Sequence, residues 1–178
     1  MLKIVIPAGG RLWDEQSERF IRNSKERTLQ LEHSLVAISK WESKWKTPFL
    51  SDKEKTTAMM IDYIRCMTVT QNVDPDVYYF LTQQHIDEVT KYINDPMTAT
   101  WFSDAKQKGG TGEVITNEVI YSKMLEAGIP FECQKWHLNR LITLIRVHNE
   151  RMNPKKMSKQ EILQRQRDIN KRRRAGLK

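Results

Sequence analysis

One strongly apolar helical segment, from Trp136 to about Met152, constrains the fold more than any other feature of the sequence. Apolar residues recur there at helical spacing and cover more than half of the helix circumference: Leu138, Leu141, Ile142, Leu144, Ile145 and Val147. Other elements must cover so wide an apolar face. We therefore expect this segment to be the central helix of the hydrophobic core.

The residues after this segment are basic. Residues 151–178 contain 11 Lys and Arg against two acidic residues, a net charge of +9, whereas the first 150 residues contain 19 basic and 20 acidic residues. The contrast predicts two parts: a mainly helical domain with an N-terminal β element over 1–152, and a basic C-terminal helical tail over 153–178. A near-neutral domain argues against a broad nucleic-acid-binding face on it.

Alternating apolar and polar residues predict a small N-terminal sheet. Residues 2–6 form one expected strand, and residues 20–22, 23–26 and 27–31 have the pattern of strand, turn and strand. After Leu31 the apolar period becomes helical, which predicts a helix over about 33–46 that Pro48 stops. The sequence therefore favours a mainly α fold, namely a compact helical bundle with a small N-terminal β-sheet or hairpin and a basic C-terminal helix.

Capping patterns predict where further helices begin and end. These patterns are the capping box Ser51-Asp-Lys-Glu54, Asp74-Pro75, Thr82, the segment 116–127 closed by Gly128, and a second capping box, Ser158-Lys-Gln-Glu161, before a helix through about Arg174.

Catalytic and metal-binding patterns are weak. Cys133 and His137 stand four residues apart, but a metal needs at least three ligands and only His148 is near. A nucleophilic pair would need an oxyanion hole and an orienting group. We expect a buried thiol and an interfacial or capping histidine instead. The glycine-rich segment 106–112 lacks the order of a phosphate loop and is expected to be a linker. We predict no catalytic residue, cofactor or metal, and hence no enzyme.

Composition indicates an intracellular, reduced setting without a membrane span. Two cysteines give neither a disulfide framework nor zinc spacing. No apolar run approaches the roughly 18 residues that a spanning helix needs. The N-terminal residues 1–10 have too short an apolar core for a signal peptide.

Glu42 is the charged residue that the sequence singles out for a structural role. It falls among Leu35, Ile38 and Trp45 on the apolar side of its helix. A buried carboxylate needs a cation or several donors. Glu42 is therefore either a structural pin, bonded to a basic side chain or backbone amides of another element, or a rim residue that reaches solvent. Trp41, Trp45 and Trp136 are expected in structural positions.

The basic tail is the expected partner-binding region. Its cations have three possible roles: binding nucleic acid with strong salt dependence, binding an acidic protein surface, or a solvated face with no partner. Tail residues 155–174 contain no aromatic residue, which argues against base stacking. The expected partner-binding residues are Lys155, Lys156, Lys159, Arg165, Arg167, Lys171, Arg172, Arg173 and Arg174.

Several segments resemble the tail assembly chaperones of tailed bacteriophages, proteins encoded near the tail tape measure. The segments that carry the resemblance are Leu29–Lys46 (LQLEHSLVAISKWESKWK), Pro48-Phe-Leu50, Thr98-Ala-Thr-Trp101, Ile129–Arg140 (IPFECQKWHLNR) and Met157-Ser-Lys-Gln-Glu161. From about residue 20 onward, the resemblance covers most of the chain. It implies a non-enzymatic protein that binds the tape measure or the tail tube protein, in the host cell cytoplasm or retained in the virion.

The resemblance implies no catalytic residue.

A tape measure protein is long and helical and exposes apolar stripes before the tail tube encloses it, so a chaperone would cover those stripes. Two alternatives use the basic tail differently: a nucleic-acid-binding protein, and a structural protein of the virion. Self-association stays open.

Overall fold

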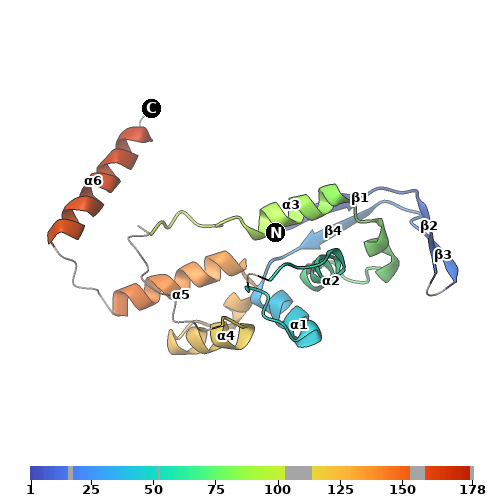
Figure 1. Cartoon of the computed structure of the whole chain (residues 1–178), viewed down its shortest axis with the longest axis horizontal. Helices are drawn as coiled ribbons and strands as arrows, with labels where there is room; N and C mark the ends of the chain where they lie inside the picture. The colour runs from blue at the N-terminus through green and yellow to red at the C-terminus, as the bar shows by residue number, and fades with distance from the viewer. Residues whose placement is uncertain (16–17, 52, 103–113, 153–158, 177–178) are drawn as a thin grey trace.

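The computed structural model describes residues 1–15, 18–51, 53–102, 114–152 and 159–176, and it is mainly α-helical (Figure 1). Two 3-10 helices, η1 (Pro75–Phe80) and η2 (Phe131–Lys135), lie between the α-helices. The α-helices are α1 (Leu35–Trp45), α2 (Thr57–Met67), α3 (Gln83–Ile93), α4 (Asn117–Glu126), α5 (Leu138–Met152) and α6 (Lys159–Ala175).

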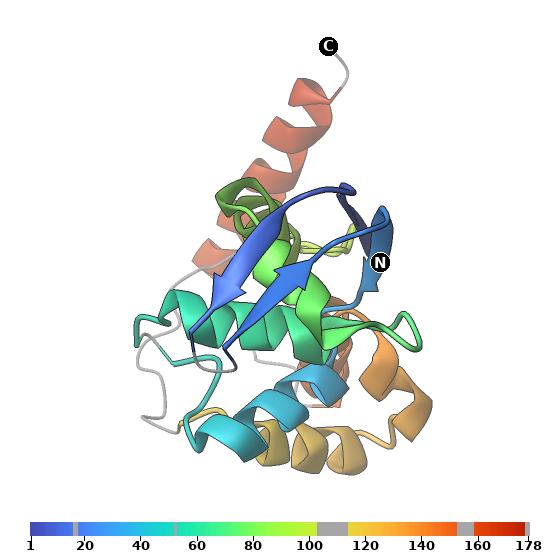
Figure 2. The same cartoon turned by 90° about the vertical axis from the view of Figure 1, so that its right-hand side faces the viewer.

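The strands form one interrupted antiparallel ribbon. Strand β1 (Leu2–Ile6) pairs with β4 (Arg27–Leu31), and β2 (Arg11–Asp14) pairs with β3 (Arg19–Arg22). Leu2 faces Leu31 and Arg11 faces Arg22, so both pairs share one register. Between them the ribbon bends at Gly9 and Gly10, whose φ values of 107° and 90° are costly for other residues. The β2–β3 end faces the viewer in Figure 2.

The predicted N-terminal sheet exists, but the expected partners of its strands were wrong. Residues 20–22 and 27–31 are strands, yet they do not pair with each other across residues 23–26. The connecting residues lie opposite the bend, where the backbone N–H of Gly9 donates to the carbonyl of Asn23 at 2.8 Å. The missed strand β2 supplies the partner of β3. It is short, and its alternation is weak.

Helix α1 takes the central position that we predicted for the apolar segment 136–152. Leu35, Ile38 and Trp41 are fully buried, and α1 packs against α2, α4 and η2. Helix α5 buries only Leu138, Leu141 and Ile145, while Ile142 is 38% exposed. The prediction for α5 was wrong because this helix packs on α4 and η2 through one side only.

Some of the predicted capping signals are helix starts in the structure. Asp74 and Thr82 each accept a hydrogen bond from a backbone N–H in the first turn of η1 and α3, and α4 begins at Asn117, directly after Thr116. Ser34, which was not predicted as a cap, accepts from the backbone N–H of Ala37 in the first turn of α1. The capping box at 51–54 was wrong as a helix start. Helix α2 begins after Thr56, whose side chain accepts from the N–H of Met59, while the hydroxyl of Ser51 donates to the carbonyl of Pro48.

Helix α6 lies apart from the other helices in Figure 1, at the end of the molecule opposite the β2–β3 hairpin. Its range agrees with the predicted helix through about Arg174. The expected chain break at Asn153-Pro154, the cap at Ser158 and the linker 106–112 lie outside the described residues. The two-part division at residue 152 stays a prediction.

Candidate functional site

The carboxylate of Glu42 connects α1 to two other segments. One oxygen accepts from the backbone N–H of Phe49 at 2.7 Å. The other accepts from the backbone N–H and the side-chain amide of Asn117, at 2.8 and 2.6 Å. Asn117 is the first residue of α4, and the preceding Thr116 makes no side-chain cap. Glu42 therefore caps α4 from another helix, where a negative charge also complements the helix dipole.

This geometry distinguishes the two alternatives for Glu42. Its side chain is buried, and its oxygens are occupied by donors from the chain itself. Glu42 is therefore the structural pin, with backbone amides among its partners, and is not a residue at the rim of the core that reaches solvent. Charge-assisted bonds of this kind are stronger than neutral ones, so Glu42 holds α1, α4 and the segment at Phe49 together.

His137 directly precedes α5, and both of its ring nitrogens are hydrogen-bonded to backbone groups. Its Nδ1 accepts from the N–H of Asn139 at 3.3 Å, so the proton of the neutral ring is on Nε2, which donates to the carbonyl of Tyr92 at 3.1 Å. Burial lowers the pKa of His137, which favours this neutral form. The predicted capping histidine agrees with these contacts, and Cys133 is buried.

A second histidine, His33, was missed by the sequence analysis. It is buried just before α1, and its Nδ1 shares a hydrogen bond of 2.5 Å with the Tyr63 hydroxyl. The rings of His33 and His137 lie edge to face with centroids 5.0 Å apart. Burial, with a smaller effect of His137, lowers the pKa of His33 to about 3, so this ring is neutral at physiological pH. No local pattern marks His33, because its burial depends on α2 and α5.

We call His33, Glu42, Tyr63, Asn117 and His137 the buried polar centre. Glu42 joins α1 to the beginning of α4. His33 joins the beginnings of α1 and α5 to α2, because its ring bonds to Tyr63 and its carbonyl accepts from the N–H of Leu138 at 2.7 Å. Among the residues that the structure describes, no three His, Cys, Asp or Glu side chains are grouped to hold a metal ion. The centre has the properties of a structural junction.

The three tryptophans expected in structural positions contact the helical core. The Trp41 indole is fully buried and donates to the carbonyl of Met59 at 3.0 Å. The Trp45 indole donates at 2.8 Å to Asp62, whose other oxygen lies 2.5 Å from the ammonium of Lys44. Trp136 is partly buried, with the guanidinium of Arg140 at 4.2 Å from its ring centroid.

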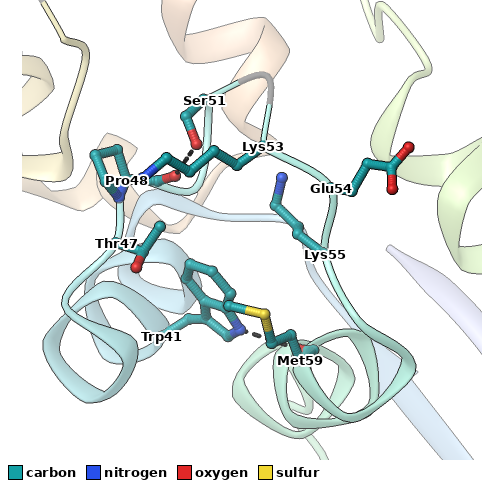
Figure 3. Close-up of a pocket in the computed structure, with 8 residues that line it drawn as sticks. All are labelled: Trp41, Thr47, Pro48, Ser51, Lys53, Glu54, Lys55 and Met59. Atoms are coloured by element: carbon teal, nitrogen blue, oxygen red, sulfur yellow. Dashed lines mark hydrogen bonds between the residues drawn. The ribbon is translucent and has the colours of Figure 1, made fainter.

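A small pocket opens beside the end of α1 (Figure 3). Its volume is about 150 Å³, below the roughly 300–1,000 Å³ of small-molecule sites. The Lys55 ammonium lies 4.8 Å from the centroid of Phe49. The lining residues are Trp41, Thr47, Pro48, Ser51, Lys53, Glu54, Lys55 and Met59. They give no arrangement of acid, base and nucleophile, so we assign no chemistry to this pocket.

The described cations of the basic tail are exposed on α6: Arg165, Arg167, Lys171, Arg172, Arg173 and Arg174. Lys155 and Lys156 lie outside the described residues, as does the side chain of Lys159. The guanidinium of Arg172 lies 3.4 Å from the ring centroid of Trp101, and that of Arg146 lies 3.9 Å from Phe102. The fold therefore brings an aromatic residue to the basic helix, although the tail sequence contains none.

The β2–β3 hairpin carries a second set of exposed aromatic residues. Trp13 and Phe20 face each other across the strands with centroids 4.7 Å apart, and the Arg11 guanidinium lies 3.5 Å from the Phe20 centroid. Arg19 fixes the hairpin to η1 through an ion pair of 2.7 Å with Asp76. Trp13 and Trp101 are 52% and 45% exposed, whereas Trp41, Trp45 and Trp136 lie in or against the core.

Comparisons of the chain with family models, with curated proteins and with solved structures found no match. None of the helices in the described part of the chain is long and apolar enough to cross a membrane.

Proposed function

We propose that this chain is a non-enzymatic tail assembly chaperone of a tailed bacteriophage that binds the tape measure or the tail tube protein in the host cell cytoplasm. The observation that carries the proposal is α6, a helix whose described cations and apolar side chains are exposed together. Such a surface suits a protein partner with acidic and apolar groups. The sequence resemblance supplies the identity of that partner.

The buried polar centre supports the same proposal. Its carboxylate and imidazole groups are hydrogen-bonded to backbone amides, carbonyls and a tyrosine hydroxyl, which accounts for their positions through the fold. The parts of the molecule that remain for function are its outer surfaces, as binding without catalysis requires.

Co-expression with the tape measure protein, followed by size-exclusion chromatography, tests the proposal. We expect the two proteins to co-elute and the soluble yield of the tape measure to increase. Failure to co-elute with both the tape measure and the tail tube protein would contradict it. Mass spectrometry of purified virions separates a chaperone, which should be scarce there, from a structural virion protein.

The proposal includes a compact helical domain over 1–152 and a separable basic tail. Limited proteolysis with trypsin should first remove the tail and leave a resistant fragment that retains the hydrophobic core. Early cleavage throughout the first 152 residues would overturn the two-part organisation and leave the binding proposal to the co-elution test.

A further inference from the structure

Helix α6 has too few apolar residues to be stable by burial within this chain. Ile162 and Ile169 are 50% and 38% exposed, and Leu163 is also exposed. Residues 159–175 contain seven Lys and Arg against two acidic residues. An isolated helix of this length is marginal in water, so a bound partner would stabilise it.

One face of α6 combines these apolar residues with arginines. Ile162, Arg165, Ile169 and Arg172 follow at intervals of three, four and three residues, which places them along the same side of a helix. On this side Arg172 is stacked on Trp101, while Ile162 and Ile169 are exposed. We call Trp101, Ile162, Arg165, Ile169 and Arg172 the α6 surface.

We propose that the α6 surface binds an acidic amphipathic helix of the partner protein, an inference that rests on the proposed function. Ile162 and Ile169 lie seven residues apart, two helical turns, and so can receive the apolar stripe of a second helix. The arginines beside them complement carboxylates on the rim of that stripe. Trp101 extends the contact area with a rigid aromatic side chain, a residue type that contributes strongly to interfaces.

The apolar residues favour a protein helix over nucleic acid as the partner. Phosphate groups would use the arginines and lysines of α6 but would leave Ile162 and Ile169 in water. An amphipathic helix covers the isoleucines and the arginines at the same time. The two partners therefore differ in their dependence on the isoleucines.

Fluorescence anisotropy with a labelled peptide of about 20 residues tests the inference, a length that spans α6. The probe has leucines at helical spacing with flanking glutamates, and the full chain is titrated into it. We expect Trp101→Ala to weaken binding about tenfold and the double variant Ile162→Ser/Ile169→Ser to weaken it more. Circular dichroism of each variant establishes that the chain is folded.

Two matched controls distinguish the contribution of the Arg172–Trp101 contact from the effect of losing a charge and from the effect of losing an exposed tryptophan. Arg172→Gln and Arg174→Gln remove the same charge from the same helix, but only Arg172 contacts Trp101. Arg172→Gln should weaken binding several-fold more than Arg174→Gln. Trp13→Ala removes a similarly exposed tryptophan from the hairpin and should leave the affinity unchanged.

The inference is overturned if the wild-type chain does not bind the peptide, or if all variants bind it equally. It is also overturned if a single-stranded oligonucleotide binds more tightly than the peptide and the isoleucine variant binds both equally well. Co-elution with the tape measure distinguishes these failures. If the wild type and the α6 variants co-elute with it equally, the proposed function stands and its surface lies elsewhere.

Discussion

In the buried polar centre the carboxylate of Glu42 accepts three hydrogen bonds from fixed donors, whereas on α6 the described cations face solvent. Both regions are rich in polar groups, but they relate differently to the core. The centre satisfies its groups internally, so removing one leaves partners unpaired. The described α6 cations are exposed, so each contributes little to folding. Stability measurements and binding measurements should therefore separate the two regions.

The largest effect on stability is expected for Glu42→Ala. This substitution leaves the N–H groups of Phe49 and Asn117 buried without their acceptor, and we expect a loss of about 3–4 kcal/mol in the free energy of unfolding. Urea denaturation measures this loss. Glu54→Ala, at an exposed glutamate, is the matched control and should change the free energy by less than about 0.5 kcal/mol. Equal effects of the two substitutions would remove the distinction between centre and surface.

Acid should destabilise the protein through His33. Its pKa is about 3 in the folded chain and near 6.5 when unfolded, so the unfolded state binds the additional proton between these values. The stabilising contribution is complete above pH 6.5 and falls by about 1.4 kcal/mol per pH unit as the pH decreases toward 3.

Urea denaturation at several pH values, compared with His33→Gln, isolates this contribution from that of the carboxyl groups. The variant should be less stable at neutral pH but should lose less of its stability on acidification than the wild type. Parallel curves would show that His33 binds its proton equally in the folded and the unfolded chain, and this result would contradict the lowered pKa.

A smaller loss is expected for Tyr63→Phe, which keeps the ring stacked on Phe49 at 4.0 Å and removes only the hydroxyl. Nδ1 of His33 then lacks its partner in the core, which should cost about 1–2 kcal/mol. The change in thermal melting temperature measures it. No loss of stability would show that the hydroxyl and His33 do not hold each other in place.

The smallest effects are expected on α6. Arg172→Gln should lower the free energy of unfolding by at most about 1 kcal/mol through loss of the stack on Trp101, and Arg174→Gln should change it by less than about 0.5 kcal/mol. Chemical denaturation of both variants is the measurement. If either substitution destabilised the chain as strongly as Glu42→Ala, α6 would belong to the core, and its cations could not be assigned to partner binding.

The residues of the candidate sites differ in whether their neighbours in the sequence indicate their role. Glu42 was recognised because a carboxylate is unusual on an apolar helix face, and the residues within a few positions of it show that face. Its partner Asn117 lies 75 residues later, where no local rule indicates it. His33 has no anomalous neighbours in the sequence and acquires its environment from Tyr63 and His137. Trp101 and Arg172 are 71 positions apart, so the sequence of the tail, which contains no aromatic residue, gives no sign of this contact.

By itself, the sequence determined the mainly helical class, the helix starts at Asp74 and Thr82, and the concentration of positive charge after residue 150. These depend on spacing and on side chains that hydrogen-bond within one turn, which are local interactions. The tertiary structure decided which strands pair, that α1 rather than α5 is central, and that Trp101 lies against α6. These outcomes depend on which apolar faces and buried polar groups satisfy one another across the chain, and no local segment contains that information.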